Sequence, residues 1–153
     1  MLTQEEKQLL LKDLSARLPY GVQTLADSDK EFDGGIIGRL VGIVPYTSKK
    51  YDFQEHSFYQ EGCLTPFTIE EIRPYLRSMS SMTEEECKEL GELSATIENV
   101  GESLPNVPYY IEVARPEQID WLNARHFDYR GLIEKGLAIE VTEENNPYKT
   151  ELL

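Results

Sequence analysis

The chain has 153 residues, a length typical of one domain with its own hydrophobic core. Hydrophobic residues make up 40% of it and charged residues 28%, which is typical of a folded globular protein and excludes a disordered chain. The formal net charge of -13 disfavours direct binding to nucleic acid or to an anionic membrane, because Lys and Arg must neutralise the negative charge of both.

The sequence also predicts the compartment of the protein. No apolar run approaches the roughly 18 residues needed to cross a bilayer, and Met1 to Glu6 is acidic where a signal peptide would be basic. Cys63 and Cys87 are too few and too far apart for a disulfide framework or a zinc knuckle, so we expect buried free thiols. These features predict a cytoplasmic protein that does not enter membranes.

The first segment predicts a helix over residues 3–18. Thr3 and Glu6 have the spacing of a capping box, in which each side chain accepts a hydrogen bond from the backbone N–H of the other residue. The apolar face consists of leucines at spacings of three and four, and Pro19 ends the helix. These leucines are Leu10, Leu11, Leu14 and Leu18.

Between residues 21 and 59 the pattern changes to that of strands. Extended segments are predicted at residues 22–25, 36–44 and 51–59, joined by turns rich in Gly, Asp and Ser. Three such strands in sequence favour an antiparallel meander, which could be a small curled sheet or a partial barrel.

The middle of the chain contains two more capping boxes. Thr68 with Glu71 predicts a short helical turn over residues 66–72 that Pro74 limits, followed by a linker over residues 75–82. Thr83 with Glu86 predicts the start of a helix over residues 84–99, and the acidic residues of its first turn complement the helix dipole.

The last third is predicted to contain a strand at residues 109–113 and a helix at residues 116–125 that Pro116 begins. Asp128 is expected to cap a short helix through Glu134, which Gly136 ends, before a half-buried strand at residues 137–141. The predicted fold is a single α+β domain over residues 1–141, with a polar tail over residues 142–153 that frays.

Residues 68–141 resemble a group of small hypothetical proteins from gut Bacteroidales and their phages. The likeness lies in the order and spacing of Ile72 to Glu86, Ile119 to Asn123, and His126 to Glu140; members often have proline at the position of Ser78, which would stiffen that linker. The group has no assigned activity, cofactor or catalytic residue. The resemblance therefore implies only a bacterial or phage protein in the cytoplasm.

The densest set of candidate functional residues lies between positions 121 and 130. His126 near Asp128 could act as a general base, but a capping Asp128 would have its oxygens occupied by backbone donors. Aromatic residues here could form an interface hot spot or belong to the core. The candidates for an interaction surface are Trp121, Arg125, His126, Tyr129 and Arg130.

Other kinds of site have weaker support. A metal site could combine His56, His126 and a carboxylate, but no His-x-His or similar spacing supports one. The segment from Gly34 to Gly38 lacks the Gly-Lys-Ser/Thr ending of a phosphate loop, so a bulged hairpin is the better interpretation. No cofactor is predicted.

The leading hypothesis from the sequence is a noncatalytic interaction or accessory protein of a bacterial phage or mobile element, which binds an unidentified protein partner. One alternative is a small hydrolase-like enzyme that uses His126 with a nearby acid. Another is an acidic DNA mimic, since residues 77–153 hold 16 acidic and 7 basic residues. Mimicry requires a dense row of acids, however, and capping explains most of those in this chain.

Overall fold

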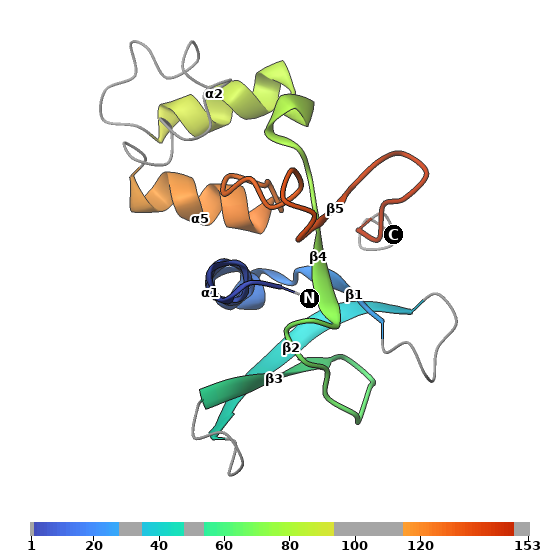
Figure 1. Cartoon of the computed structure of the whole chain (residues 1–153). Helices are drawn as coiled ribbons and strands as arrows, with labels where there is room; N and C mark the ends of the chain where they lie inside the picture. The colour runs from blue at the N-terminus through green and yellow to red at the C-terminus, as the bar shows by residue number, and fades with distance from the viewer. Residues whose placement is uncertain (1, 28–34, 48–53, 94–114, 149–153) are drawn as a thin grey trace. The chain divides into compact units, whose positions relative to one another are not determined.

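A computed structural model describes residues 2–27, 35–47, 54–93 and 115–148 (Figure 1). Within these ranges the protein is α+β, with an N-terminal helix, an open sheet and further helices. The chain divides into two compact units, one from residues 1–75 and 146–153 and the other from residues 76–145. None of the described helices is long and apolar enough to span a membrane.

Helix α1, Gln4–Arg17, begins at the predicted capping box, and a 3-10 turn, Leu18–Tyr20, follows it. Its buried face contains Leu10 and Leu14 as predicted, but Leu11 and Leu18 are only partly buried. Asp13 and Arg17 complete the buried stripe and form an ion pair at 2.8 Å, with both side chains 0% exposed. The predicted leucine face is therefore partly wrong, because the pairing of two opposite charges allows them to be buried.

The sheet has five strands, with β4 and β5 added beside the three strands of the predicted meander, and it is not closed into a barrel. Strand order is β3-β2-β1-β4-β5, and β1 pairs antiparallel with both β2 and β4, while β2 pairs antiparallel with β3. The two end strands are β3 and β5. The bounds are Gln23–Ala26 for β1, Ile36–Thr47 for β2, Gln54–Gln60 for β3, Ile72–Leu76 for β4 and Ile139–Glu140 for β5.

Strand β4 occupies a segment that was predicted as a helical turn and a linker, and that prediction is wrong. The predicted Thr68–Glu71 hydrogen bond forms, with the Thr68 N–H donating to Glu71 Oε1 at 2.9 Å. It closes a turn, however, and does not begin a helix. Pro74 is compatible with the strand because it pairs with Thr24, next to the hydrogen-bonded position of Leu25 and Arg73 in the ladder with β1, so its missing N–H faces away from β1.

A buried amide connects the three strands of the first unit that are adjacent in sequence. Gln60 of β3 is 1% exposed, and its Nε2 donates to Thr24 Oγ1 of β1 at 3.0 Å and to Ile36 O of β2 at 3.0 Å. A Cβ on Gly38 would lie 3.3 Å from the Gln60 side chain. The missing side chain of Gly38 thus leaves room for Gln60 to reach across β2.

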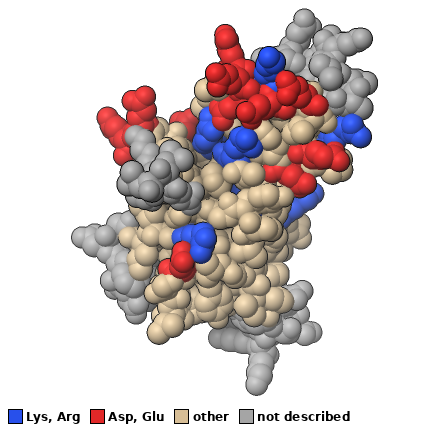
Figure 2. Space-filling view, turned by 180° about the vertical axis from the view of Figure 1, so that it is seen from behind, with Lys and Arg blue, Asp and Glu red and all other residues tan. Residues whose placement is uncertain are grey.

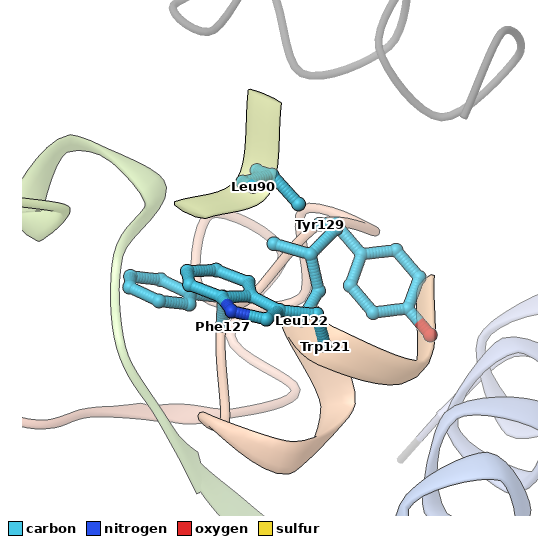
Figure 3. Close-up of a cluster of buried hydrophobic side chains, with 5 residues drawn as sticks. All are labelled: Leu90, Trp121, Leu122, Phe127 and Tyr129. Carbon is cyan, nitrogen blue, oxygen red and sulfur yellow. The ribbon is translucent and has the colours of Figure 1, made fainter. Parts of the chain in front are cut away.

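The second unit contains a 3-10 turn, Met79–Ser81, and helices α2, Glu84–Glu92, and α5, Pro116–Ala124, which lie side by side (Figure 1). The Thr83–Glu86 capping box and the Pro116 start agree with the predictions. The rest of the helix predicted to residue 99 and the strand predicted at residues 109–113 lie outside the described residues. The core of the unit is formed by Leu90, Trp121, Leu122, Phe127 and Tyr129 (Figure 3).

The helix predicted from Asp128 to Glu134 does not form, and this segment consists of turns. Asp128 does act as a cap, since its Oδ1 and Oδ2 accept hydrogen bonds from the N–H groups of Leu132 and Ile133, both at 2.9 Å. Gly136 has the expected left-handed backbone, with φ = 75°. Because both carboxylate oxygens of Asp128 bind backbone N–H groups and Gly136 has a left-handed backbone, this segment forms turns and no regular helix.

Candidate functional site

Each aromatic side chain of the predicted corner in the second unit lies beneath an arginine. Trp121 and Phe127 stack with ring centroids 5.8 Å apart (Figure 3), and the guanidinium of Arg125 lies 4.3 Å from the centroid of the Trp121 ring. Arg77 lies 4.1 Å from the Phe127 ring and Arg130 4.7 Å from the Tyr129 ring. Three cation–π contacts therefore account for the aromatic and basic density of this segment.

Most of the predicted interaction residues are buried. Trp121 and His126 are each 9% exposed and Tyr129 is 1% exposed, with its hydroxyl donating to Asn123 Oδ1 at 2.7 Å. Arg125 and Arg130 are partly exposed, and Arg125 forms an ion pair with Glu89 of α2 at 3.2 Å. The structure thus brings the five residues together, but only the two arginines offer a large accessible surface.

His126 ends helix α5 in an unusual conformation. Its φ of 64° is left-handed, and its N–H donates to Asn123 O while the N–H of Phe127 donates to Leu122 O, which is the Schellman pattern. Glycine is preferred at this position because it has no Cβ to clash. This backbone conformation was not predicted, because a histidine is not a typical signal for a left-handed residue.

The geometry gives little support to a catalytic role for His126. Both oxygens of Asp128 accept backbone N–H groups, so this acid serves the turn that follows it, and no hydrogen bond between Asp128 and the imidazole is found. Cys87 is not an activated nucleophile, because burial and then the nearby carboxylates of Glu86 and Glu84 raise the pKa of its thiol.

The acidic side chains around α2 are interleaved with basic ones (Figure 2). Glu86 forms an ion pair with Arg77 at 2.8 Å, and Glu89 pairs with Arg125. This mixed surface differs from the uninterrupted row of acids that imitation of a DNA backbone requires, so it gives that alternative no support.

A groove in the first unit, of about 410 Å³, lies between α1, β3 and the turn at residues 68–70. Leu11 and Ile69 supply apolar surface, whereas Phe58, which also lines the groove, is fully buried. Polar residues also line it, among them His56 and Lys7, whose ammonium forms an ion pair with Glu70 at 3.1 Å. This groove was not predicted from the sequence. The spacing of Lys7 and Leu11 does place both on one face of α1, and the alternation of His56 with Phe58 places both on one face of β3.

The groove borders the outer edge of β3. There the Phe58 N–H donates to Phe67 O at 2.9 Å, and Phe58 O accepts the Phe67 N–H at 2.8 Å. After Phe67 the Thr68–Glu71 turn leads the chain away from β3 and into β4, which pairs with β1. The outward N–H and C=O groups of His56 and Gln54, on the edge of β3 away from β2, therefore have no backbone partner within the described part of the chain.

The opposite face of the sheet is comparatively poor in charge (Figure 2). Ile37, Val41 and Val44 of β2 are 54%, 48% and 50% exposed. Exposed apolar side chains are common in interaction surfaces when they form a contiguous patch.

The residues that the structure describes contain no group of three or more His, Cys, Asp or Glu side chains that could hold a metal ion.

No family model matches the chain, and neither the curated proteins nor the solved structures gave a match.

Proposed function

We propose that the protein is a noncatalytic interaction or accessory protein that binds another protein in the cytoplasm of a bacterium, encoded by a phage or mobile element. The observation that carries the binding function is the groove beside the outer edge of β3, because it combines some apolar surface with backbone groups that have no partner among the described residues. The resemblance of residues 68–141 to proteins of gut Bacteroidales and their phages supports the biological setting.

A second surface for the same function is the corner of the second unit. Arg125 and Arg130 are accessible there and are held in place by the aromatic rings beneath them. Arginines fixed in this way lose little conformational entropy on binding an acidic partner. Direct binding to nucleic acid is not proposed, because the net charge is -13.

Affinity capture followed by mass spectrometry tests the proposal. The tagged full chain should recover at least one host or phage protein well above a tagged control protein of similar charge, and the two should elute together in size-exclusion chromatography. Recovery of no protein above the control would contradict the proposal.

The Arg125→Ala/Arg130→Ala double variant separates the two surfaces. If the groove is the binding site, this variant should recover the partner as well as the unmodified chain does. If the corner is the site, recovery should fall by about tenfold, the loss expected for two charged contacts. The thermal unfolding midpoint of the variant should be measured first, since both arginines lie on core aromatic rings.

A further inference from the structure

We propose that the open edge of β3 binds an extended segment of the partner as an added strand, with one apolar side chain of that segment in the groove beside α1. This inference rests on the proposed function and specifies its mode. The site would take a short extended peptide that contains an apolar residue flanked by basic residues.

The direction of the backbone groups supports strand addition. Successive residues of a strand direct their N–H and C=O groups to opposite edges. Phe58 directs its pair outward, to Phe67, so His56 and Gln54 also direct theirs away from β2. Pro45 of β2 is opposite His56 and agrees with this assignment. Proline has no N–H, so it fits a position where the two strands exchange no hydrogen bonds.

The groove lies where a side chain of the added strand would point. Paired residues of neighbouring strands share a face of the sheet, so a residue opposite His56 would lie on the same face as His56 and Phe58. That face borders the groove, where Leu11 and Ile69 also lie. The backbone groups without a partner in the described part of the chain thus adjoin a groove that is partly apolar, and strand-addition sites combine backbone hydrogen bonds with side-chain pockets in this way.

Charge complementarity specifies the segment further. Glu70 lines the groove and pairs with the ammonium of Lys7, and Glu55 lies next to His56 on β3. The whole chain carries a net charge of -13, which attracts basic segments and repels acidic ones. We therefore expect basic residues on either side of the apolar one.

Phage display of random dodecapeptides on the immobilised full chain tests the proposal. Enriched peptides should have an apolar residue in a β-prone stretch next to Lys or Arg. Their synthetic forms should bind in fluorescence polarisation more weakly as salt is added. No enrichment over a bare surface would overturn the proposal, as would enrichment of acidic peptides only.

Two substitutions at one position separate the backbone from the side chain. His56→Pro removes the outward N–H but no hydrogen bond to β2, and proline is tolerated on an edge strand. His56→Pro should bind the peptide at least about tenfold more weakly than the matched variant His56→Ala, because both lack the imidazole and only the alanine variant keeps the N–H. Equal binding to His56→Pro and His56→Ala would overturn strand addition.

Amide NMR of the unmodified chain gives a second measurement if His56→Pro does not fold. The selected peptide should slow hydrogen exchange of the His56 N–H and leave that of Ser57, which faces β2, nearly unchanged. No change at His56 would overturn the proposal.

Failure of the proposed function has a different outcome from failure of strand addition: affinity capture then recovers no partner with the unmodified chain. Capture of the same partner by His56→Pro and by the unmodified chain would support the proposed function and overturn strand addition.

Discussion

His126 holds a left-handed backbone at the end of α5, with φ = 64°, while its side chain is 9% exposed. A residue with a Cβ loses roughly 1 kcal/mol in this conformation relative to glycine. The conformation is kept because the N–H of His126 and that of Phe127 close the helix, and because the C=O of His126 accepts the N–H of Arg77 at 2.7 Å.

The strain at His126 predicts an order of stability between two variants. His126→Gly should have a free energy of unfolding about 1 kcal/mol higher than His126→Ala, since both lose the imidazole and only alanine keeps the clash. Urea denaturation of the full chain measures this difference. At His56, in extended backbone, the order should reverse, with the alanine variant the more stable. The same order at both positions would contradict the assigned conformation.

At the scale of elements, the first turn of α2 combines a capping box with an ion pair. Glu86 Oε1 accepts the Thr83 N–H at 3.0 Å, and the Glu86 carboxylate binds the Arg77 guanidinium through two contacts of 2.8 Å. Arg77 also lies on the Phe127 ring and pairs its backbone with His126 and Asp128. One glutamate therefore connects the helix start to the core of the second unit.

This connection predicts a dependence of stability on pH. The hydrogen bond from Arg77 holds the pKa of Glu86 below its ordinary value of 4.5, and burial opposes this only in part. Because the folded-state pKa is the lower one, the stabilisation is fully present above the ordinary pKa and is lost as the pH falls through the folded-state pKa.

Glu86→Gln should therefore lower the free energy of unfolding by about 1 kcal/mol near neutral pH. The difference from the unmodified chain should shrink below the ordinary pKa of 4.5. Thermal unfolding at a series of pH values measures it, with Glu85→Gln on the exposed side of the same turn as the control. A difference that does not vary with pH would contradict this role.

At the scale of the whole molecule, residues close to the C-terminal end of the described chain belong to the same unit as the N-terminal helix. The hydroxyl of Tyr148, in the segment that was expected to fray, donates to Tyr75 O at 2.7 Å and accepts the Gln23 N–H at 3.0 Å. A single side chain thus bonds to the backbone of both β1 and β4. Buried backbone groups in such positions are costly to leave unpaired.

Tyr148→Phe should lower the free energy of unfolding by about 1–3 kcal/mol, because it leaves a backbone donor and a backbone acceptor without their partner. Tyr59→Phe is the matched control, since no hydrogen bond of its hydroxyl is found among the described residues, and its effect should be within about 0.5 kcal/mol. Urea denaturation of both variants checks the prediction. Equal effects would show that the Tyr148 bonds contribute little.

Local signals were the ones that the sequence determined well. The Thr3–Glu6 and Thr83–Glu86 boxes, the Pro116 start and the left-handed Gly136 were all predictable, because each depends on residues within one or two turns of one another. The α+β class followed from the same periodicities.

Only the tertiary structure decided the remaining features. Strand β4 forms despite a turn signal and a proline because β1, far away in the sequence, supplies its hydrogen bonds. The buried Asp13–Arg17 pair and the cation–π contacts at the corner depend on how distant segments pack. Among the described residues, the outer edge of β3 beyond Phe58 has no neighbouring strand because the turn after Phe67 leads into β4 instead, and no local pattern encodes this path.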